Sequence, residues 1–225
     1  MITELFPYNK ISRETVDGSR QYLLPDGSRV ASVTTILDAT KSEEKKQALN
    51  AWRQRVGEDQ ARQIVTEAAG RGTRMHKFLE QHVMSDAMQE PGSNPYSQQS
   101  RQMAQIIVDH YLKPHVSEFY GSEVNLWYPG LYAGTTDCVA RWQDRLAILD
   151  FKQTNRPKKT EWIEDYFLQL AAYAMAHNEL YNTNIQQGVI LMCSANYEPQ
   201  NWIVSGLEFQ RYCDAWSQRV DQFYR

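Results

Sequence analysis

The chain has 225 residues, 27 acidic against 24 basic side chains, and a formal net charge of −3. This length can bury a full core without disulfide or metal staples, and the balanced charge lacks the basic excess usual in domains that bind nucleic acids. The three cysteines are too few and too scattered for a disulfide framework or a zinc ribbon, and no apolar run reaches the roughly 18 residues of a membrane span.

The whole chain is expected to form one domain. Residues 1–70 are interpreted as an N-terminal hairpin with a helical elaboration, and residues 71–225 as the core. The first residues have no basic region and include Glu4, which argues against an organelle presequence. The expected location is therefore the cytoplasm, with no membrane partner, and the sequence identifies no protein partner.

The first part of the chain predicts a hairpin followed by helices. Residues 20–37 read as two extended pieces around a turn at Pro25-Asp26-Gly27. Residues 43–69 carry apolar side chains at helical spacing, and Gly57 predicts a break between two helices. The basic side chains of this region either form a solvated helix face or track phosphates, and both alternatives stay open: Lys41, Lys45, Lys46, Arg53, Arg55 and Arg62.

A further helix is expected over residues 73–84. Arg71-Gly72-Thr73 is typical of a helix start, with Thr73 as the N-cap. On that helix His76 would share a polar face with Thr73 and Glu80. A lone helical histidine is usually structural, so His76 becomes a site candidate only through its setting.

A loop, a helix and a strand come next. Residues 85–97 predict a long loop, and residues 98–119 predict a helix that is kinked or interrupted near Pro114. Residues 122–128 alternate in the manner of a strand. Near its start, Glu123 is either a further carboxylate for a site or a residue of its rim.

The chain is organised around a two-stranded ribbon. Its runs, 133–142 and 145–152, are separated by Gln143-Asp144. A two-residue connection is short enough for a tight hairpin, so the runs are expected to pair antiparallel, with Trp142 opposite Arg145. Both faces of the ribbon carry apolar side chains, which predicts that it is covered on both sides.

This register predicts a metal site. Asp137 would lie opposite Asp150, with Lys152 on the same face and Phe151 on the other. Opposed Cβ atoms roughly 4.5–5.5 Å apart allow two carboxylates to hold one divalent cation. An ordinary salt-bridge cluster is the alternative, but like charges opposed in a covered ribbon destabilise the fold unless a cation neutralises them. A slip of one residue in the turn would send the two aspartates to opposite faces.

The remaining chain predicts further helices and strands. A helix is expected over residues 160–181, with Gln169 and Tyr173 one turn apart on a single face. The basic side chains of the loop before it suit phosphate contacts: Arg156, Lys158 and Lys159. The last expected elements are two strands and a closing helix: residues 187–194, 201–204 and 206–225.

Four motifs in one order resemble the PD-(D/E)XK nucleases, most closely the RecB-type branch. They are a helical Gly72-Thr-x-x-His76-x-x-Leu-Glu80, Gly134-x-x-Asp137, Asp150-x-Lys152 and Gln169-x-x-x-Tyr173. Residues 32–37 and 52–57 look like the N-terminal region of the mitochondrial genome maintenance exonucleases and their phage relatives. A phage-encoded protein of this kind would act in the cytoplasm of the host. No proline precedes Asp137 and the second acid is an aspartate, and the family tolerates both variations.

The resemblance implies an α/β fold with a mixed central β-sheet flanked by helices, a restriction-endonuclease-like αβββαβ core with an N-terminal helical elaboration. It also implies hydrolysis of DNA phosphodiester bonds with Mg²⁺ or Mn²⁺. The predicted oxygen and nitrogen ligands are Asp137, Asp150, the Phe151 carbonyl, His76 and Glu123. Lys152 would orient or deprotonate a water and offset charge on the phosphate, and Gln169 and Tyr173 would hold the substrate strand or orient Lys152.

The resemblance favours a single DNA strand that enters from a free end beneath a helical element. Arg53 and Arg55 are the residues expected to line that element, and tryptophans near the site could stack on bases: Trp52, Trp127, Trp142 and Trp162. Two alternatives stay open. One is a structure-specific endonuclease of the same superfamily, and the other is a catalytically silent DNA-binding accessory protein for replication or recombination.

Overall fold

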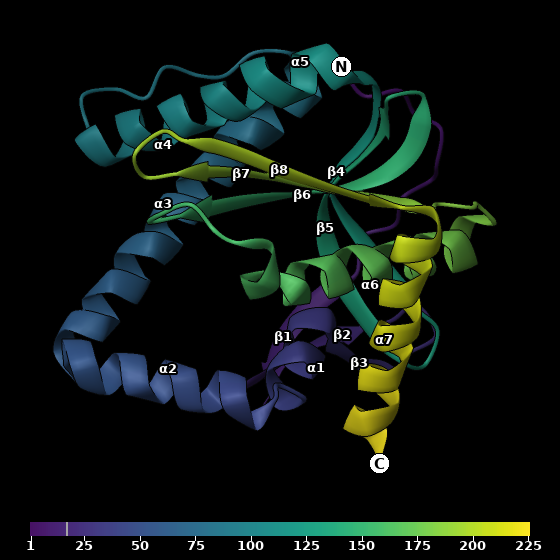
Figure 1. The fold of residues 1–225 in the computed structure, drawn as a ribbon. Helices are drawn as coiled ribbons and strands as arrows, with labels where there is room; N and C mark the ends of the chain where they lie inside the picture. The colour runs from purple at the N-terminus through teal and green to yellow at the C-terminus, as the bar shows by residue number, and fades with distance from the viewer. Residues whose placement is uncertain (17) are drawn as a thin grey trace.

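The computed structural model describes residues 1–16 and 18–225 and contains an open, mixed, eight-stranded sheet with helices on both faces (Figure 1). This confirms the predicted α/β class. The strands are β1 (Ser12–Val16), β2 (Ser19–Leu23), β3 (Arg29–Ser32), β4 (Val116–Tyr128), β5 (Tyr132–Trp142), β6 (Arg145–Thr154), β7 (Gln187–Ser194) and β8 (Pro199–Ser205).

The helices form two layers, with α3 and α4 on one face of the sheet and α6 and α7 on the other (Figure 1). The α-helices are α1 (Val33–Ala39), α2 (Glu43–Val56), α3 (Glu58–Ser85), α4 (Pro95–Ile107), α5 (Lys113–His115), α6 (Glu164–Tyr181) and α7 (Gly206–Tyr224). Two short turns complete the set, the π-helical η1 (Val108–Leu112) and the 3-10 η2 (Thr160–Trp162). Among the helices described, none is both long enough and apolar enough to cross a membrane.

One edge of β5 is shared between two partners. The strand order is β1-β2-β3-β5-β6-β7-β8, and β4 runs antiparallel along the whole of β5 on its other edge. On the shared edge β6 pairs with Cys138–Trp142, whereas β3 pairs in parallel with Tyr132 and Ala133. The two partners therefore diverge over residues 134–137. We call this opening the β5 fork.

The predicted register of the central ribbon is confirmed. Trp142 pairs with Arg145 and the ladder continues to Cys138 and Leu149. Gln143 and Asp144 have φ angles of +46° and +63°, as a two-residue hairpin turn with matching twist requires.

The prediction that helices cover both faces of the ribbon is also confirmed. Side chains of the ribbon pack into two separate core clusters, Val139 and Ile148 on the α6 and α7 side and Cys138, Ala140, Ala147, Leu149 and Phe151 on the α3 and α4 side.

For the N-terminal segment the predicted turn at residues 25–27 is confirmed, but the predicted extent of the strands around it is wrong. The strands around residues 25–27 are β2 and β3, but β1 joins them as a third strand. The second extended piece stops at Ser32, because residues 33–39 form α1. The Ser32 hydroxyl accepts the N–H of Thr35 at 3.0 Å, so N-capping and burial of Val33 outweigh the strand preference of the β-branched residues.

The predicted helix start at Thr73 is wrong. The break at Gly57 is confirmed, with a φ of +86°, but α3 then runs without interruption to Ser85. Thr73 lies inside the helix and its hydroxyl donates to the carbonyl of Ala69 at 3.1 Å. The helix continues through Gly70 and Gly72 because Met75 and its neighbours pack against α4. The local sequence around Thr73 does not reveal this packing.

The remaining elements give the αβββαβ order. The loop predicted over residues 85–97 is present, although α4 begins within it at Pro95. The helix predicted over residues 98–119 ends at His115, after a π-helical turn, because Val116 begins a β4 that is longer than predicted. The later helices and strands follow the predicted order to the end of α7.

Candidate active site and metal centre

The motif residues converge on a pocket of about 220 Å³ at the β5 fork. Its walls come from the N-terminal hairpin, α1, the three central strands and α6. The lining residues are Arg13, Arg20, Tyr22, Ser32, Val33, Thr34, Glu123, Gly134, Thr135, Asp137, Asp150, Lys152, Gln169 and Tyr173. His76 approaches the same place from α3 and lines a neighbouring hollow.

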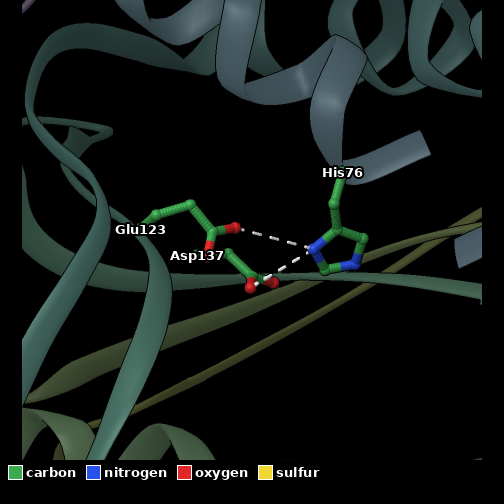
Figure 2. Close-up of side chains that lie close together, drawn as sticks. All are labelled: His76, Glu123 and Asp137. Carbon is green, nitrogen blue, oxygen red and sulfur yellow. Dashed lines mark ion pairs between the residues drawn. The ribbon is translucent and has the colours of Figure 1, made fainter. Parts of the chain in front are cut away.

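Three side chains form a group with metal-ligand geometry. The Nδ1 atom of His76 lies 3.4 Å from Oδ1 of Asp137 and 4.0 Å from Oε1 of Glu123 (Figure 2). One ligand atom from each residue falls within 4.8 Å of the other two. Carboxylate oxygens with an imidazole nitrogen suit a divalent cation such as Mg²⁺ or Mn²⁺, so the donor set fits such an ion.

Glu123 reaches this group through an unusual backbone conformation. Its φ is +51°, inside a strand where the flanking Ser122 and Val124 pair with Cys138 and Thr136. A non-glycine residue in the left-handed region costs free energy and persists where the surrounding structure holds it. Burial and the nearby Asp137 together raise the pKa of Glu123 to about 7.

Asp137 is held at the point where β5 and β6 separate. The last backbone pair between β5 and β6 is Cys138 with Leu149. Beyond it the Oδ2 atom of Asp137 accepts the N–H of Phe151 at 2.6 Å, so a side-chain oxygen takes the place of a backbone carbonyl. Burial alone would raise the pKa of Asp137, but His76, Lys152 and this N–H together lower it. Asp137 is therefore ionised.

Asp150 pairs with Lys152, the lysine predicted on the same face. The ammonium of Lys152 lies 2.6 Å from the Asp150 carboxylate, which is 4% exposed. Burial raises the pKa of Asp150 to about 6 against the opposing effect of Lys152, and Asp137 adds to the rise. Burial lowers the pKa of Lys152, but Asp150 and Asp137 outweigh it and the net pKa is raised.

That Asp137 and Asp150 hold one ion between them stays a prediction. Each carboxylate has its own cationic partner, His76 for Asp137 and Lys152 for Asp150. The physical reason is that opposed like charges in a covered site lower their free energy by pairing with the nearest cation. The full ligand set, with Asp150 and the Phe151 carbonyl, stays a prediction.

Sequence reasoning missed Tyr166. The Nζ atom of Lys152 lies 4.9 Å from the centre of the Tyr166 ring, a cation–π distance that fixes the lysine over the first turn of α6. Tyr166 is therefore a further residue in contact with Lys152, and the roles of Gln169 and Tyr173 stay predictions. Tyr166, Gln169 and Tyr173 share one helical face at spacings of three and four residues, which is the signal that could have identified it.

Tyr173 explains why a glycine precedes Asp137. A Cβ atom added at Gly134 would lie 2.7 Å from Cε1 and 2.9 Å from Oη of Tyr173, which is 6% exposed and cannot swing away. The aromatic ring thus packs directly on the backbone of β5 beside the carboxylates.

We expect Gly134→Ala to displace this ring, to cost about 1–3 kcal/mol of unfolding free energy by overpacking and to impair any catalysis at the pocket. Gly188→Ala is the matched control, because its Cβ would meet Leu170 at 2.8 Å in the core, outside the pocket lining. Denaturant unfolding and nuclease rates of the two variants would be compared. Equal rates in both variants would contradict a specific contact between Gly134 and the site.

The predicted DNA-binding residues lie outside this pocket. Arg53 and Arg55 are exposed on α2. Arg156, Lys158 and Lys159 are in the loop after β6, where the Lys158 N–H donates to Gln200 and the Lys159 ammonium lies 5.5 Å from the Trp162 ring. None of these five residues is among the described residues that line the pocket.

Arg13 and Arg20 line the pocket and were not predicted as site residues. They lie more than 100 residues before the carboxylates, in the hairpin that β3 attaches to β5. No local spacing could have signalled them.

Three vertebrate proteins named Mitochondrial genome maintenance exonuclease 1 are similar to this chain. The human protein is 28% identical over 86% of this chain and 58% of its own length. The Xenopus tropicalis protein is 29% identical over 76% of this chain and 50% of its own length. The Mus musculus protein is 26% identical over 86% and 59%. These homologues confirm the resemblance predicted from the motifs, although the chain spans only about half to three-fifths of their length.

The remaining comparisons are less specific. No protein-family model matches the chain. Among solved structures, the crystal structure of an exonuclease candidate from Eubacterium rectale superposes with a TM-score of 0.49 at 16% identity, over 69% of this chain and 64% of that one. A likeness at this score carries no functional argument.

Proposed function

We propose that this protein is a divalent-metal-dependent DNA exonuclease of the PD-(D/E)XK type that degrades a single strand from a free end. The observation that carries the proposal is the convergence of Asp137, Asp150 and Lys152 with His76 and Glu123 at the β5 fork. The similarity to proteins named exonuclease supports the same class of reaction.

Asp137, Glu123 and His76 would hold the ion, with Asp150 beside them. When bound, Mg²⁺ or Mn²⁺ supplies charge neutralisation for a phosphate and lowers the pKa of a water. The donor set is mainly carboxylate oxygen, which favours hard cations over softer ones.

The chain's own residues would position the phosphate and offset its charge. Lys152 carries a raised pKa and stays protonated, so it acts as a fixed cation toward a phosphorane rather than as a base. Tyr166 and Asp150 hold its ammonium in place. The Phe151 N–H in turn fixes the Asp137 carboxylate, so both groups are preorganised before substrate arrives.

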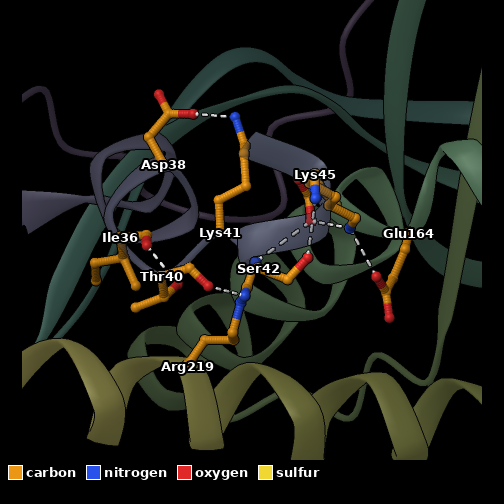
Figure 3. A network of polar contacts seen from close by, with 9 residues as sticks. Ile36, Asp38, Thr40, Lys41, Ser42, Lys45, Glu164 and Arg219 are labelled. Carbon is orange, nitrogen blue, oxygen red and sulfur yellow. Dashed lines mark hydrogen bonds and ion pairs between the residues drawn. The ribbon is translucent and has the colours of Figure 1, made fainter. Parts of the chain in front are cut away.

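The free-end requirement is supported by an arch. Helix α2 and the first half of α3 project from the sheet and meet at Gly57 (Figure 1). No residue of α2 is buried. At its base Lys45 binds Glu164 of α6 at 2.7 Å, and Arg219 of α7 donates to the carbonyl of Thr40 (Figure 3). We call α2 with residues 58–70 of α3 the arch.

The other base of the arch is tied to the active-site strand. The guanidinium of Arg71 donates to the Gln153 side chain at 2.7 Å, and the Gln153 amide donates to the carbonyl of Ala68 at 2.9 Å. Gln153 is the residue after Lys152, so the arch begins beside the proposed reaction centre. An element fixed at both ends would admit a strand by threading.

The arch also carries groups that suit a single strand. Trp52, Arg53 and Arg62 line a hollow of about 240 Å³ at its bend, where stacking and phosphate contacts could combine. Of the other tryptophans considered for stacking, Trp142 is fully buried and is excluded, whereas Trp162 is 61% exposed beside Lys159.

We expect closed circular single-stranded DNA to resist digestion under conditions that degrade the same strand once it is linearised. A closed circle has no end to pass beneath an element that is anchored at both bases. End-labelled linear single strands, linear duplexes and closed circles would be incubated with Mg²⁺ or EDTA and resolved on a denaturing gel.

Rapid cutting of the circle would reject threading and favour the endonuclease alternative, and no cutting of any DNA would favour the catalytically silent alternative.

Substitution of Arg53 and Arg55 by glutamine is expected to weaken binding of the linear strand, most strongly at low salt. Arg211→Gln, an exposed position on α7, is the control for general loss of charge.

A further inference from the structure

Two arginines of the N-terminal hairpin lie at the mouth of the site. Strands β1 and β2 pair Arg13 with Tyr22 and Thr15 with Arg20, so the two arginines are diagonal neighbours on one face. Tyr22 of that face is 2% exposed, and its hydroxyl lies 3.3 Å from Oγ1 of Thr135. This face of the hairpin therefore points into the β5 fork.

The arginines also separate the site from a second hollow. This hollow, of about 680 Å³, lies between the hairpin and α3. Its lining residues are Arg13, Arg20, Gly72, Thr73, His76, Lys77, Glu80 and Glu123. Only Arg13, Arg20 and Glu123 line both this hollow and the active-site pocket as the described residues outline them. A polymer that extends from one space into the other would pass residues common to both linings, and the two arginines are the cations among them.

The hairpin is fixed where the arginines stand. The Thr35 hydroxyl of α1 donates to the carbonyl of Arg20 at 3.0 Å. The N–H of Ile11 donates to Asn125 of β4 at 3.1 Å, and the Asn125 amide donates to Thr135 at 2.9 Å. The backbone that carries Arg13 and Arg20 is thus tied to α1, β4 and β5, the elements that also frame the carboxylates.

Charge balance gives the arginines a role. The pocket holds three carboxylates, and its lysine is already bound to Asp150. Without a bound metal ion these carboxylates repel an approaching phosphodiester, and cations at the entrance offset that repulsion. Both hairpin arginines are exposed, and within residues 1–16 and 18–225 neither has an ion-pair partner. A guanidinium binds phosphate through two parallel N–H groups, which fixes orientation as well as charge.

We infer that Arg13 and Arg20 form a clamp for the DNA phosphate next to the scissile one, where the strand passes from the second hollow into the active-site pocket. This inference rests on the proposed function and assigns a substrate-positioning role to the hairpin. The clamp acts on the strand beside the reaction centre, whereas Lys152 acts at the centre itself.

The clamp is tested first by binding alone, so that the result does not depend on cleavage. The variants are Arg13→Gln/Arg20→Gln and the control Arg29→Gln, whose guanidinium pairs with Glu14 on the opposite face of the same three-stranded unit. Fluorescence anisotropy of a labelled single strand in EDTA would be measured over a series of salt concentrations. We expect the double variant to bind more weakly and to lose about 0.7 in the slope of log K against log salt for each phosphate contact removed.

Substrates that lack one charge locate the clamp. A series of strands would each carry a single neutral methylphosphonate at a different position relative to the cleaved bond. Wild-type protein should lose affinity and KM should rise when the neutral group is next to the scissile phosphate. The double variant should show no further loss of affinity when the neutral group is at that position.

The binding and cleavage measurements test the clamp and the proposed nuclease function separately. Equal affinity and salt slope in the double variant and Arg29→Gln would overturn the clamp, as would an unchanged methylphosphonate profile. DNA binding by wild type without metal-dependent cleavage would reject the proposed nuclease, while the binding comparison would still judge the clamp. Arg13→Lys/Arg20→Lys, which keeps charge and loses the planar fork, should retain the salt slope with reduced affinity, and this also controls for folding.

Discussion

Asp137→Asn is expected to lower metal-dependent DNA cleavage by at least about 100-fold. The substitution keeps the shape of the side chain and an oxygen that can accept the Phe151 N–H, but it removes the charge that a divalent cation requires from its ligand. Loss of a few kcal/mol of charge stabilisation corresponds to a hundredfold or more in rate. The measurement is the single-turnover rate on a labelled single strand over a range of Mg²⁺ concentrations.

The matched control for this change is Asp144→Asn. Asp144 is exposed in the turn of the same β5–β6 hairpin, and asparagine tolerates its φ of +63°. Cleavage by Asp144→Asn should equal that of wild type. Comparable activity in both variants would show that Asp137 is not a ligand.

Stability of the metal-free variants gives a second result. Because His76, Lys152 and the Phe151 N–H together lower the pKa of Asp137 in the folded protein, its charge stabilises the fold above the unfolded pKa, and that contribution is lost as the pH falls. The pKa of Asp150 is raised to about 6 by burial, so its charge opposes folding at neutral pH. At pH 8 we therefore expect metal-free Asp150→Asn to lose less thermal stability than metal-free Asp137→Asn.

Like charges that lie opposite each other in a ribbon repel, so the loss of either carboxylate would by itself favour folding. The ion pair between Asp137 and His76 reverses that expectation for Asp137. The cost of Asp137→Asn should shrink toward zero in acid, where Asp137 of the wild type is also neutral. A cost that is independent of pH would contradict this electrostatic account.

Lys152→Ala is expected to reduce the rate of cleavage by about 10²–10³-fold while DNA binding stays within the range of wild type. The lysine is one preorganised cation at the reaction centre, and removal of such a group usually has an effect of this size. Single-turnover rates would be compared with binding of a single strand measured by anisotropy in Ca²⁺.

Lys113→Ala is the control for Lys152→Ala, since it breaks an exposed ion pair with Asp109 of 2.7 Å far from the pocket. The fold should survive Lys152→Ala, because Asp150, with a pKa already raised to about 6, takes up a proton more readily once its partner is gone. Near wild-type turnover would show that Lys152 is only a structural partner of Asp150.

The central ribbon could be predicted because its information is local. A two-residue turn and side-chain alternation fix the register, and the register places Asp137 near Asp150 and Lys152. The order of the later helices and strands followed from periodicity in the same way. Gly134 was recognised as part of a motif, and its physical reason, the Tyr173 ring, appeared only once α6 was placed over β5.

The rest depended on contacts between distant segments. The start predicted at Thr73 failed because burial against α4 sustains α3 through its glycines. The pairing of His76 with Asp137 and the place of Arg13 follow from how α3 and the hairpin pack against β5. No spacing within one segment encodes such meetings, since they are set by tertiary packing.

The β5 fork has a consequence for the order in which the molecule folds. Cys138 and Leu149 close a hairpin locally, whereas Ala31 must find Tyr132 about 100 residues away. Loop closure over that separation makes docking of the N-terminal strands a late event. Until they dock, β5 exposes backbone groups at Tyr132 and Ala133 that can pair with another chain. The step that removes this aggregation-prone edge also brings Arg13 and Arg20 to the carboxylates, so the chain would become protected and able to receive DNA at the same moment.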